Sequence, residues 1–241
     1  MGRNVIVTGG GTGIGRAVAA RFAADGDAVL ITGRRAGPLQ ATAEELGAGV
    51  RFAVSDATDP AQVEQLRGEL PATVDVLVNN AGGNTDFDQP AVTDLKSLAA
   101  NWHTNLAANL VSAVLLTAAV RDRLAAGGAV VNIGSIAADK GAGAYGAAKA
   151  GLASWNVTLA AELGPSGITA NVVSPGYIAD TEFFRDQLTD ERRASLVAAT
   201  HTGRAGAPAD IADAVHFLAS AAARQITGQV LNVNGGERTT R

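Results

Sequence analysis

Two side chains four positions apart, Tyr145 and Lys149, are the strongest candidates for chemistry in this sequence. Residues at positions i and i+4 share one face of a helix, so the phenol and the ammonium can point into one pocket. A nearby ammonium stabilises a phenolate and lowers the pKa of a tyrosine from about 10 towards neutral pH. We therefore expect Tyr145 to act as a general acid towards a carbonyl oxygen.

Ser135 stands ten residues before Tyr145, just after an apolar run that begins at Ala129. Ligands of open α/β sheets bind beyond the carboxyl ends of the strands, so this hydroxyl could hold the same carbonyl oxygen. A serine at a strand end is also a common turn residue or helix cap. The sequence alone leaves both interpretations of Ser135 open.

A glycine-rich segment at residues 8–15 separates an apolar run from an Ala-rich stretch with helical spacing. Glycines in such a turn let the backbone approach a pyrophosphate, which then rests on the helix N-terminus. The spacing is Gly-x-x-x-Gly-x-Gly, and a glycine-rich turn without a ligand is the alternative. We predict a dinucleotide site here, with contacts from Gly9, Thr12, Gly13, Ile14 and Gly15.

Two arginines, Arg34 and Arg35, follow the second apolar run, where an NAD-binding protein would carry an acidic residue for the ribose. A guanidinium pairs well with a 2′-phosphate. The arginines therefore favour NADP over NAD, and a solvated basic turn is the alternative.

Composition excludes several classes of function. The net charge is −4 and no run of Lys or Arg occurs, so nucleic-acid binding has no electrostatic support. The chain has no cysteine, which excludes disulfides and thiolate metal sites and suits a cytoplasmic protein. The three histidines lie far apart, so we predict no metal site.

We expect neither a signal peptide nor a membrane span. The N-terminus is expected to enter a strand directly, which leaves no room for a signal peptide. The apolar stretch around residues 110–120 looks too short to span a membrane.

Seven short apolar runs alternate with stretches of helical spacing, which is typical of a doubly wound α/β fold. We predict one domain over residues 1–241, with a mostly parallel seven-stranded sheet and helices on both faces, as in a Rossmann fold. The predicted strands are Val5–Thr8, Ala28–Thr32, Val50–Val54, Val74–Asn79, Ala129–Ile133, Thr169–Val173 and Val230–Val233. The predicted helices are Gly15–Ala24, Gln40–Leu46, Ala61–Leu70, Leu106–Ala119 and Tyr145–Leu163. The irregular, charged segment at residues 181–208 is expected to form a substrate lid.

Taken in order, these motifs resemble those of the short-chain dehydrogenase/reductase family over nearly the whole chain. The resemblance also rests on Asp56, on Asn79-Asn80-Ala81-Gly82, on Asn105, on Ser174-Pro175-Gly176 with Thr181, on residues 204–212, on Thr227-Gly228-Gln229 and on Gly235-Gly236. It departs from the family's pattern in the short, Ala- and Gly-rich interval between Ser135 and Tyr145. We expect that interval to leave one wall of the pocket open, at residues 137–143.

The resemblance implies a mechanism. NADPH would deliver hydride to a carbonyl carbon while Ser135 and Tyr145 hold the oxygen. Tyr145 would donate the proton and regain it through Lys149, the nicotinamide ribose and a water held by Asn105. Other cofactor contacts that the resemblance implies come from Asp56, Ala57, Asn79, Ala81, Gly82, Pro175, Gly176, Ile178 and Thr181. Without the resemblance, Asn79 and Asn105 would be taken for structural polar residues.

Several alternatives stay open. The protein could instead be an NADP-linked alcohol or sugar dehydrogenase that works oxidatively, or a catalytically silent nucleotide sensor on the same fold. We expect a small-molecule carbonyl or alcohol as substrate, with Phe183 and Phe184 in contact with it. The resemblance implies a homotetramer or homodimer. Trp155, Leu159 and the stretch Val215–Leu218 would either form its interfaces or pack within one subunit.

Overall fold

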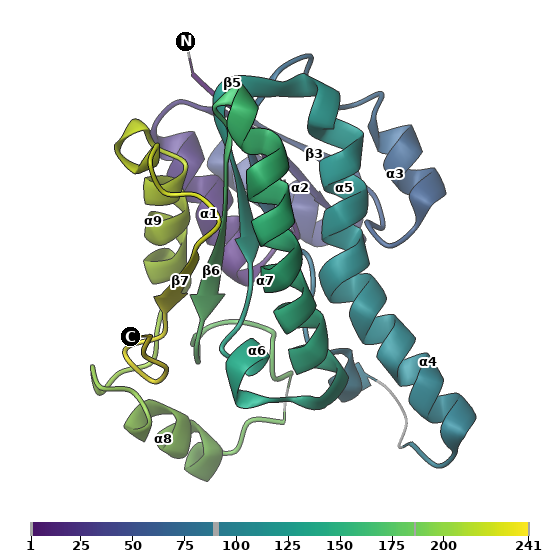
Figure 1. The fold of residues 1–241 in the computed structure, drawn as a ribbon, viewed down its shortest axis with the longest axis vertical. Helices are drawn as coiled ribbons and strands as arrows, with labels where there is room; N and C mark the ends of the chain where they lie inside the picture. The colour runs from purple at the N-terminus through teal and green to yellow at the C-terminus, as the bar shows by residue number, and fades with distance from the viewer. Residues whose placement is uncertain (1, 89–91, 186, 241) are drawn as a thin grey trace.

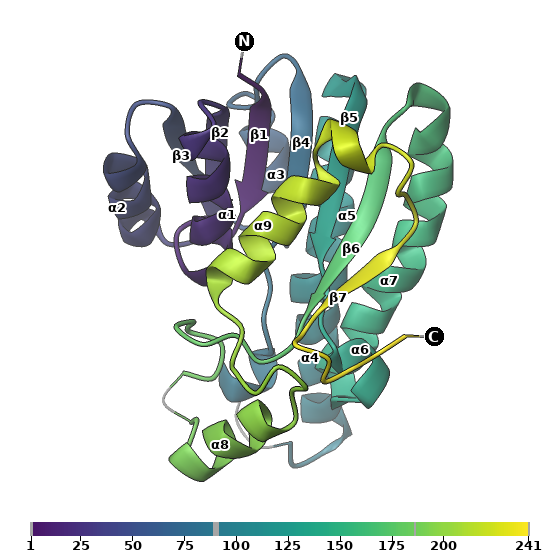
Figure 2. The same ribbon diagram turned by 90° about the vertical axis from the view of Figure 1, so that its left-hand side faces the viewer.

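Seven parallel strands form the sheet at the centre of the protein (Figure 1), and Figure 2 shows their order, β3-β2-β1-β4-β5-β6-β7. The computed structural model describes residues 2–88, 92–185 and 187–240. The strands are β1 Asn4–Thr8, β2 Ala28–Gly33, β3 Val50–Val54, β4 Val74–Asn79, β5 Leu124–Ile133, β6 Thr169–Pro175 and β7 Val230–Val233. The predicted doubly wound fold is thus confirmed, and the sheet is parallel throughout its described strands.

Helices cover both faces of this sheet (Figure 2). One face carries α1 Gly13–Ala24, α2 Ala36–Leu46 and α9 Pro208–Leu218. The other carries α3 Pro60–Leu66, α5 Ser112–Val120 and α7 Gly143–Leu163, with α4 Leu95–Leu106 beside α7. The other helical segments are η1 Thr85–Asp88, η2 Ala107–Val111, η3 Arg121–Arg123, α6 Ala137–Lys140, η4 Gly164–Ser166, α8 Asp190–Ala198 and η5 Ala221–Ala223.

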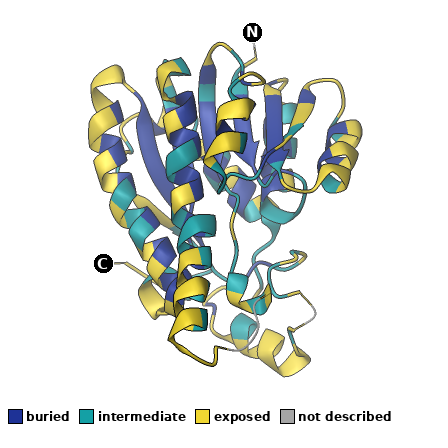
Figure 3. Ribbon diagram, turned by 90° about the vertical axis from the view of Figure 1, so that its right-hand side faces the viewer, coloured by how far each residue is buried: buried dark blue, intermediate teal, exposed yellow. Residues whose placement is uncertain are grey.

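The central strand β1 shows how the core is divided. Val5 and Val7 belong to the cluster under α1 and α9, whereas Ile6 between them belongs to the cluster under α5 and α7. Successive side chains of a strand point to opposite faces, so a strand covered on both sides is apolar at most of its positions. The dark blue strands of Figure 3 reflect this burial. The carboxyl ends of the strands therefore stand on a rigid base.

The helical stretch Leu95–Arg123 runs through α4, the π-helical segment η2, α5 and η3 without a break. It has 29 residues and a mean hydropathy of 1.4 in its most apolar window, so the prediction that this region is too short to span a membrane is wrong about its length. Leu116, Ala119 and Val120 of α5 are nevertheless buried in the core cluster between this helix and the sheet. This is the packing of a core helix.

Three of the residues weighed as interface candidates pack inside the subunit instead. Leu159, Val215 and Leu218 are at most 2% exposed, and Trp155 packs against the same core cluster as Leu159. Their apolar character therefore serves the core.

Candidate active site

The carboxyl end of β5 and the first turn of α7 bring Ser135, Tyr145 and Lys149 together. The backbone N–H groups of Gly134 and Ile136 donate to the carbonyls of Val173 (2.7 Å) and Pro175 (3.0 Å), which fixes the serine beside β6. The Ser135 hydroxyl accepts from the backbone N–H of Ala137 at 3.1 Å, and it lies near enough to the Tyr145 phenol to influence the pKa of that group. One helical turn later, Lys149 Nζ donates to the carbonyl oxygen of Ile133 at 2.8 Å.

Burial controls the protonation of this group. It raises the pKa of Tyr145 to about 12, and the nearby Ser135 hydroxyl offsets only part of that rise. Burial also lowers the pKa of Lys149 to about 8. The expectation that the ammonium lowers the pKa of Tyr145 is wrong for the cofactor-free protein, because desolvation dominates and Lys149 Nζ lies 5.9 Å from the ring centre. Tyr145 therefore carries its proton at neutral pH.

Asn105 lies at the end of α4, fully buried, directly before the π-helical segment η2. Its Nδ2 donates to Asp86 Oδ1 at 2.7 Å, and its Oδ1 accepts from the backbone N–H of Thr85 at 3.3 Å. Single π-turns inside helices are frequent at functional sites. The structure thus ties Asn105 to η1, a contact that the sequence did not suggest.

The short interval between Ser135 and Tyr145 contains the four-residue helix α6, and the C-terminal tail is ion-paired to it. Residues 139–143 are exposed, and the open wall at residues 137–143 stays a prediction. Lys140 pairs with Glu237 at 2.5 Å, and Asp139 pairs with Arg238 at 3.5 Å. The tail, which had no role in the sequence analysis, therefore contacts the short connection.

The glycine loop has the shape that a dinucleotide needs. Gly9 and Gly13 have φ values of +64° and +51°, which favour glycine. A Cβ on Gly15 would lie 2.1 Å from the carbonyl oxygen of Gly9, so no larger residue fits there. Asn80 Nδ2 donates to the carbonyls of Thr8 (2.8 Å) and Gly9 (3.2 Å) and holds the loop in place.

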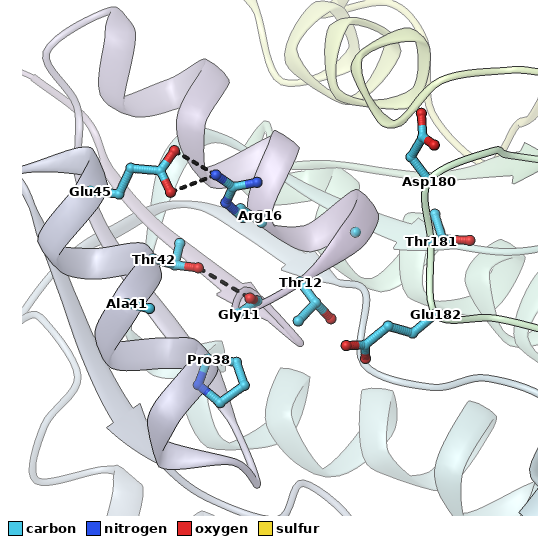
Figure 4. A pocket seen from close by; sticks show the side chains of 11 residues that line it. Gly11, Thr12, Arg16, Pro38, Ala41, Thr42, Glu45, Asp180, Thr181 and Glu182 are labelled. Atoms are coloured by element: carbon cyan, nitrogen blue, oxygen red, sulfur yellow. Dashed lines mark hydrogen bonds and ion pairs between the residues drawn. The ribbon is translucent and has the colours of Figure 1, made fainter. Parts of the chain in front are cut away.

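A cleft of about 520 Å³ opens beside this loop (Figure 4). Its lining comes from the glycine loop, α1, α2 and the start of the lid: Gly11, Thr12, Gly13, Arg16, Pro38, Ala41, Thr42, Glu45, Asp180, Thr181 and Glu182. The start of the lid faces the glycine loop across the cleft, and Glu182 extends towards Thr12. Arg16 forms an ion pair with Glu45, so a ligand in this cleft would contact a guanidinium whose charge is already paired.

The predicted 2′-phosphate arginines lie just after β2, on the same side of the protein as the cleft. Both side chains are exposed. Arg35 Nη2 contacts Glu182 Oε2 of the lid at 2.6 Å. Asp56, after β3, accepts from the backbone N–H and the hydroxyl of Thr58 through a single carboxylate oxygen. Its other oxygen and the half-buried Ala57 beside it fit the predicted adenine contacts.

Asn79 is placed differently from its neighbours Ala81 and Gly82. Its Nδ2 donates to Thr117 Oγ1 (3.0 Å) and to Asn132 Oδ1 (2.9 Å) inside the protein, which ties β4 to α5 and β5. Asn79 Oδ1 is buried and has no hydrogen-bond partner among the described residues. Ala81 borders Gly9 of the loop, while Gly82 is exposed. The Asn79 side chain is therefore chiefly structural, with one acceptor left over.

The segment after β6 reaches from the catalytic candidates to the glycine loop. Pro175 ends the strand, and Gly176 is packed so closely that a Cβ would lie 2.8 Å from that of Asn234. Ile178 is bridged to Gly206, and Thr181 Oγ1 donates to the Ile178 carbonyl at 3.2 Å. These contacts set the path on which the four predicted cofactor residues of this segment lie.

The chain matches known enzymes in sequence and in fold. A family model described as enoyl-(acyl carrier protein) reductase matches residues 9–237. A solved short-chain dehydrogenase/reductase of the glucose/ribitol dehydrogenase type from Brucella melitensis has a TM-score of 0.88 and 30% identity, covering 99% of this chain and 97% of that one. The chain belongs to the short-chain dehydrogenase/reductase family.

Two further similar proteins are informative. The 3-oxoacyl-(acyl-carrier-protein) reductase FabG of Escherichia coli strain K12 is 39% identical over 243 residues, covering 98% of this chain and 97% of the relative. A blue fluorescent protein from a metagenomic library, solved in complex with NADPH, is 35% identical with a TM-score of 0.86 and covers 99% of this chain and 98% of that one. As a member of this family, the protein is an NADP-dependent oxidoreductase that acts on carbonyl compounds or their alcohols.

Proposed function

We propose that the protein reduces a ketone, of the 3-oxoacyl type or similar, with NADPH, and that Tyr145 is the proton donor. The observation that carries this proposal is that the half-buried Ser135 and the buried Tyr145 and Lys149 are grouped at the carboxyl end of β5. Reduction needs a proton donor beside the carbonyl oxygen, and the Tyr145 phenol can be that donor. NADPH, when bound, supplies the hydride, and the residues of the chain orient the substrate and supply the proton.

The catalytic residues then have separate tasks. Ser135 and Tyr145 hydrogen-bond the substrate oxygen and stabilise the charge that develops on it. Tyr145 gives its proton to that oxygen, and Lys149 beside it stabilises the resulting phenolate. Asn105 positions the water through which the proton is replaced, and its bonds to η1 hold its amide in place.

The cofactor contacts follow the path from the glycine loop to the segment after β6. The loop residues Gly9, Thr12, Gly13, Ile14 and Gly15 hold the pyrophosphate, and Arg34 and Arg35 bind the 2′-phosphate. The remaining contacts are from Asp56, Ala57, Asn79 through its free acceptor, Ala81, Gly82, Tyr145, Lys149, Pro175, Gly176, Ile178 and Thr181. The fit of the glycine loop and the unpartnered Asn79 Oδ1 support this assignment.

The whole chain forms one catalytic domain, and residues 181–208 act as its lid. The start of this segment contacts both the arginine turn, through Glu182, and η1, through Arg185. A segment anchored at both places can cover cofactor and substrate together. Residue 186 of the lid lies outside the described residues.

The proposed assembly is a homotetramer or homodimer in the cytoplasm, where NADPH is regenerated. Large apolar side chains are exposed on α4, η2 and the adjacent α7: Leu95, Leu98, Trp102, Val111 and Val157. These helices are neighbours, and exposed apolar side chains on neighbouring helices favour an interaction surface there. Val157→Glu should shift sedimentation towards smaller species, and Val54→Glu, on the edge strand β3, should not. A wild-type protein that sediments only as a monomer at micromolar concentration contradicts this assembly.

The test of the function is NADPH oxidation with a panel of ketones that includes a 3-oxoacyl thioester. The wild type should turn over at least one, and Tyr145→Phe should lose about 100-fold or more in kcat while still binding NADPH. Retained turnover in Tyr145→Phe contradicts the mechanism. NADPH binding without turnover of any ketone supports the nucleotide-sensing alternative instead.

A further inference from the structure

Half of the aromatic residues of this protein gather beside the proposed proton donor. The sequence has ten aromatic residues. Five of them form one group, here called the aromatic cluster: Phe87, Tyr145, Tyr177, Phe183 and Phe184. Neighbouring ring centres lie 4.9–6.0 Å apart, and the ring planes are tilted or edge-on. These are the arrangements that aromatic pairs prefer.

The aromatic cluster joins segments that are distant in the chain. Phe87 lies in η1, Tyr145 in α7, Tyr177 after β6, and Phe183 with Phe184 in the lid. Polar contacts beside the rings hold the same segments together. Arg185 Nε contacts Asp88 Oδ1 at 3.0 Å, and Gln187 Nε2 donates to the Phe87 carbonyl at 3.4 Å. The rings therefore have a defined position over the active site.

Phe87, Phe183 and Phe184 are not part of the core. Each is only half-buried, and none belongs to the two core clusters under the helices. The Phe183 ring centre lies 5.7 Å from that of Tyr145. Because the Tyr145 hydroxyl must reach the carbonyl oxygen, a substituent on the carbonyl carbon comes to lie against these lid rings.

We propose that the substrate is a ketone that carries an aromatic ring, and that Phe183 and Phe184 select it by stacking. This inference rests on the proposed ketone reduction and adds the substrate class. An aromatic pair in good geometry gains about two- to twelvefold in affinity beyond the area it buries. A rigid ring also loses less freedom on binding than a flexible chain of equal carbon number. Both effects favour an aromatic ketone over an aliphatic one.

The experiment compares three methyl ketones with nine carbons each: 1-phenylpropan-2-one, 1-cyclohexylpropan-2-one and nonan-2-one. A methylene group separates the ring from the carbonyl, so the reactivity of the carbonyl hardly differs among them. We expect kcat/KM with NADPH to be about tenfold higher for the phenyl compound than for the other two. Phe183→Leu keeps an apolar side chain and should reduce this preference to about twofold or less. Phe52→Leu, at a half-exposed ring on β3, is the matched control and should keep it.

Two results would overturn the inference and leave ketone reduction intact. One is equal kcat/KM for the phenyl and cyclohexyl ketones, and the other is an undiminished preference in Phe183→Leu. Failure of the proposed function shows itself differently. NADPH then binds, but neither these ketones nor a 3-oxoacyl thioester oxidises it, and the substrate class proposed here fails with it.

Discussion

Arg35 and Glu182 form an ion pair of 2.6 Å between the turn after β2 and the first residues of the lid. Both side chains are more than half exposed, at 59% and 62%. The pair links the turn that is proposed to bind the 2′-phosphate to the lid segment that carries Phe183 and Phe184. A carboxylate of the lid thus stands where the phosphate of NADPH is expected to bind.

Glu182→Gln should strengthen NADPH binding, because the phosphate no longer competes with a carboxylate for Arg35. An exposed ion pair contributes at most about 1 kcal/mol, so we expect a gain of about fivefold or less. NADH lacks the phosphate, and its affinity should stay the same. Fluorescence titration of both cofactors measures this, with Glu69→Gln as an exposed control. Equal gains for NADH and NADPH would mean that Glu182 does not compete with the phosphate.

Arg34→Ala should weaken NADPH binding by about ten- to a hundredfold, because a hydrogen bond to a charged group is worth roughly 1.5–3 kcal/mol. NADH affinity should change little. Arg224→Ala removes an exposed arginine elsewhere and should leave both affinities alone. If the wild type prefers NADH to NADPH, the role of the two arginines as phosphate ligands is wrong.

Burial of Lys149 predicts a stability that rises with pH. Its pKa is about 8 in the folded protein against an ordinary 10.5, so the folded state binds fewer protons than the unfolded state between these values. The free energy of unfolding should therefore increase by roughly 2 kcal/mol from about pH 8 to about pH 10. Above that, Tyr145 opposes the rise, since burial keeps it protonated after the unfolded tyrosine has ionised.

Urea denaturation of the cofactor-free protein at several pH values in this window tests the claim. Lys149→Met should flatten the dependence whatever its effect on absolute stability. Lys96→Met, at an exposed position of α4, should keep it. A slope that is the same in wild type and Lys149→Met would show that other groups cause it.

The strands of the sheet and the types of residue at the site could be predicted from the sequence. The contacts between those residues could be predicted less well. Buried parallel strands are mostly apolar, and this pattern predicted the bounds of β1 and β4 to within one residue. Gly37 and Pro38 at the start of α2 hid its first turn, so that helix was placed four residues late. The pairs Arg35–Glu182 and Tyr145–Phe183 join segments distant in the chain, and no local pattern announces them.

Asp86 is the residue through which the role of Asn105 can be tested without changing Asn105. Its carboxylate accepts from Asn105 Nδ2 at 2.7 Å and from Asn101 Nδ2 at 2.9 Å. Asp86→Ala should leave the Asn105 amide less well oriented. We therefore expect kcat to fall by about three- to tenfold, while the KM for NADPH stays unchanged.

Asn101→Ala provides the matched control for this last prediction. It removes the second hydrogen bond to the same carboxylate, but the Asn101 backbone carbonyl, which also accepts from Asn105 Nδ2, remains. If Asp86 acts by orienting Asn105, the loss in kcat appears in Asp86→Ala alone and disappears in an Asn105→Ala background. Equal losses in both single variants would instead point to a general loosening of η1 against α4, and Asn105 would then be structural.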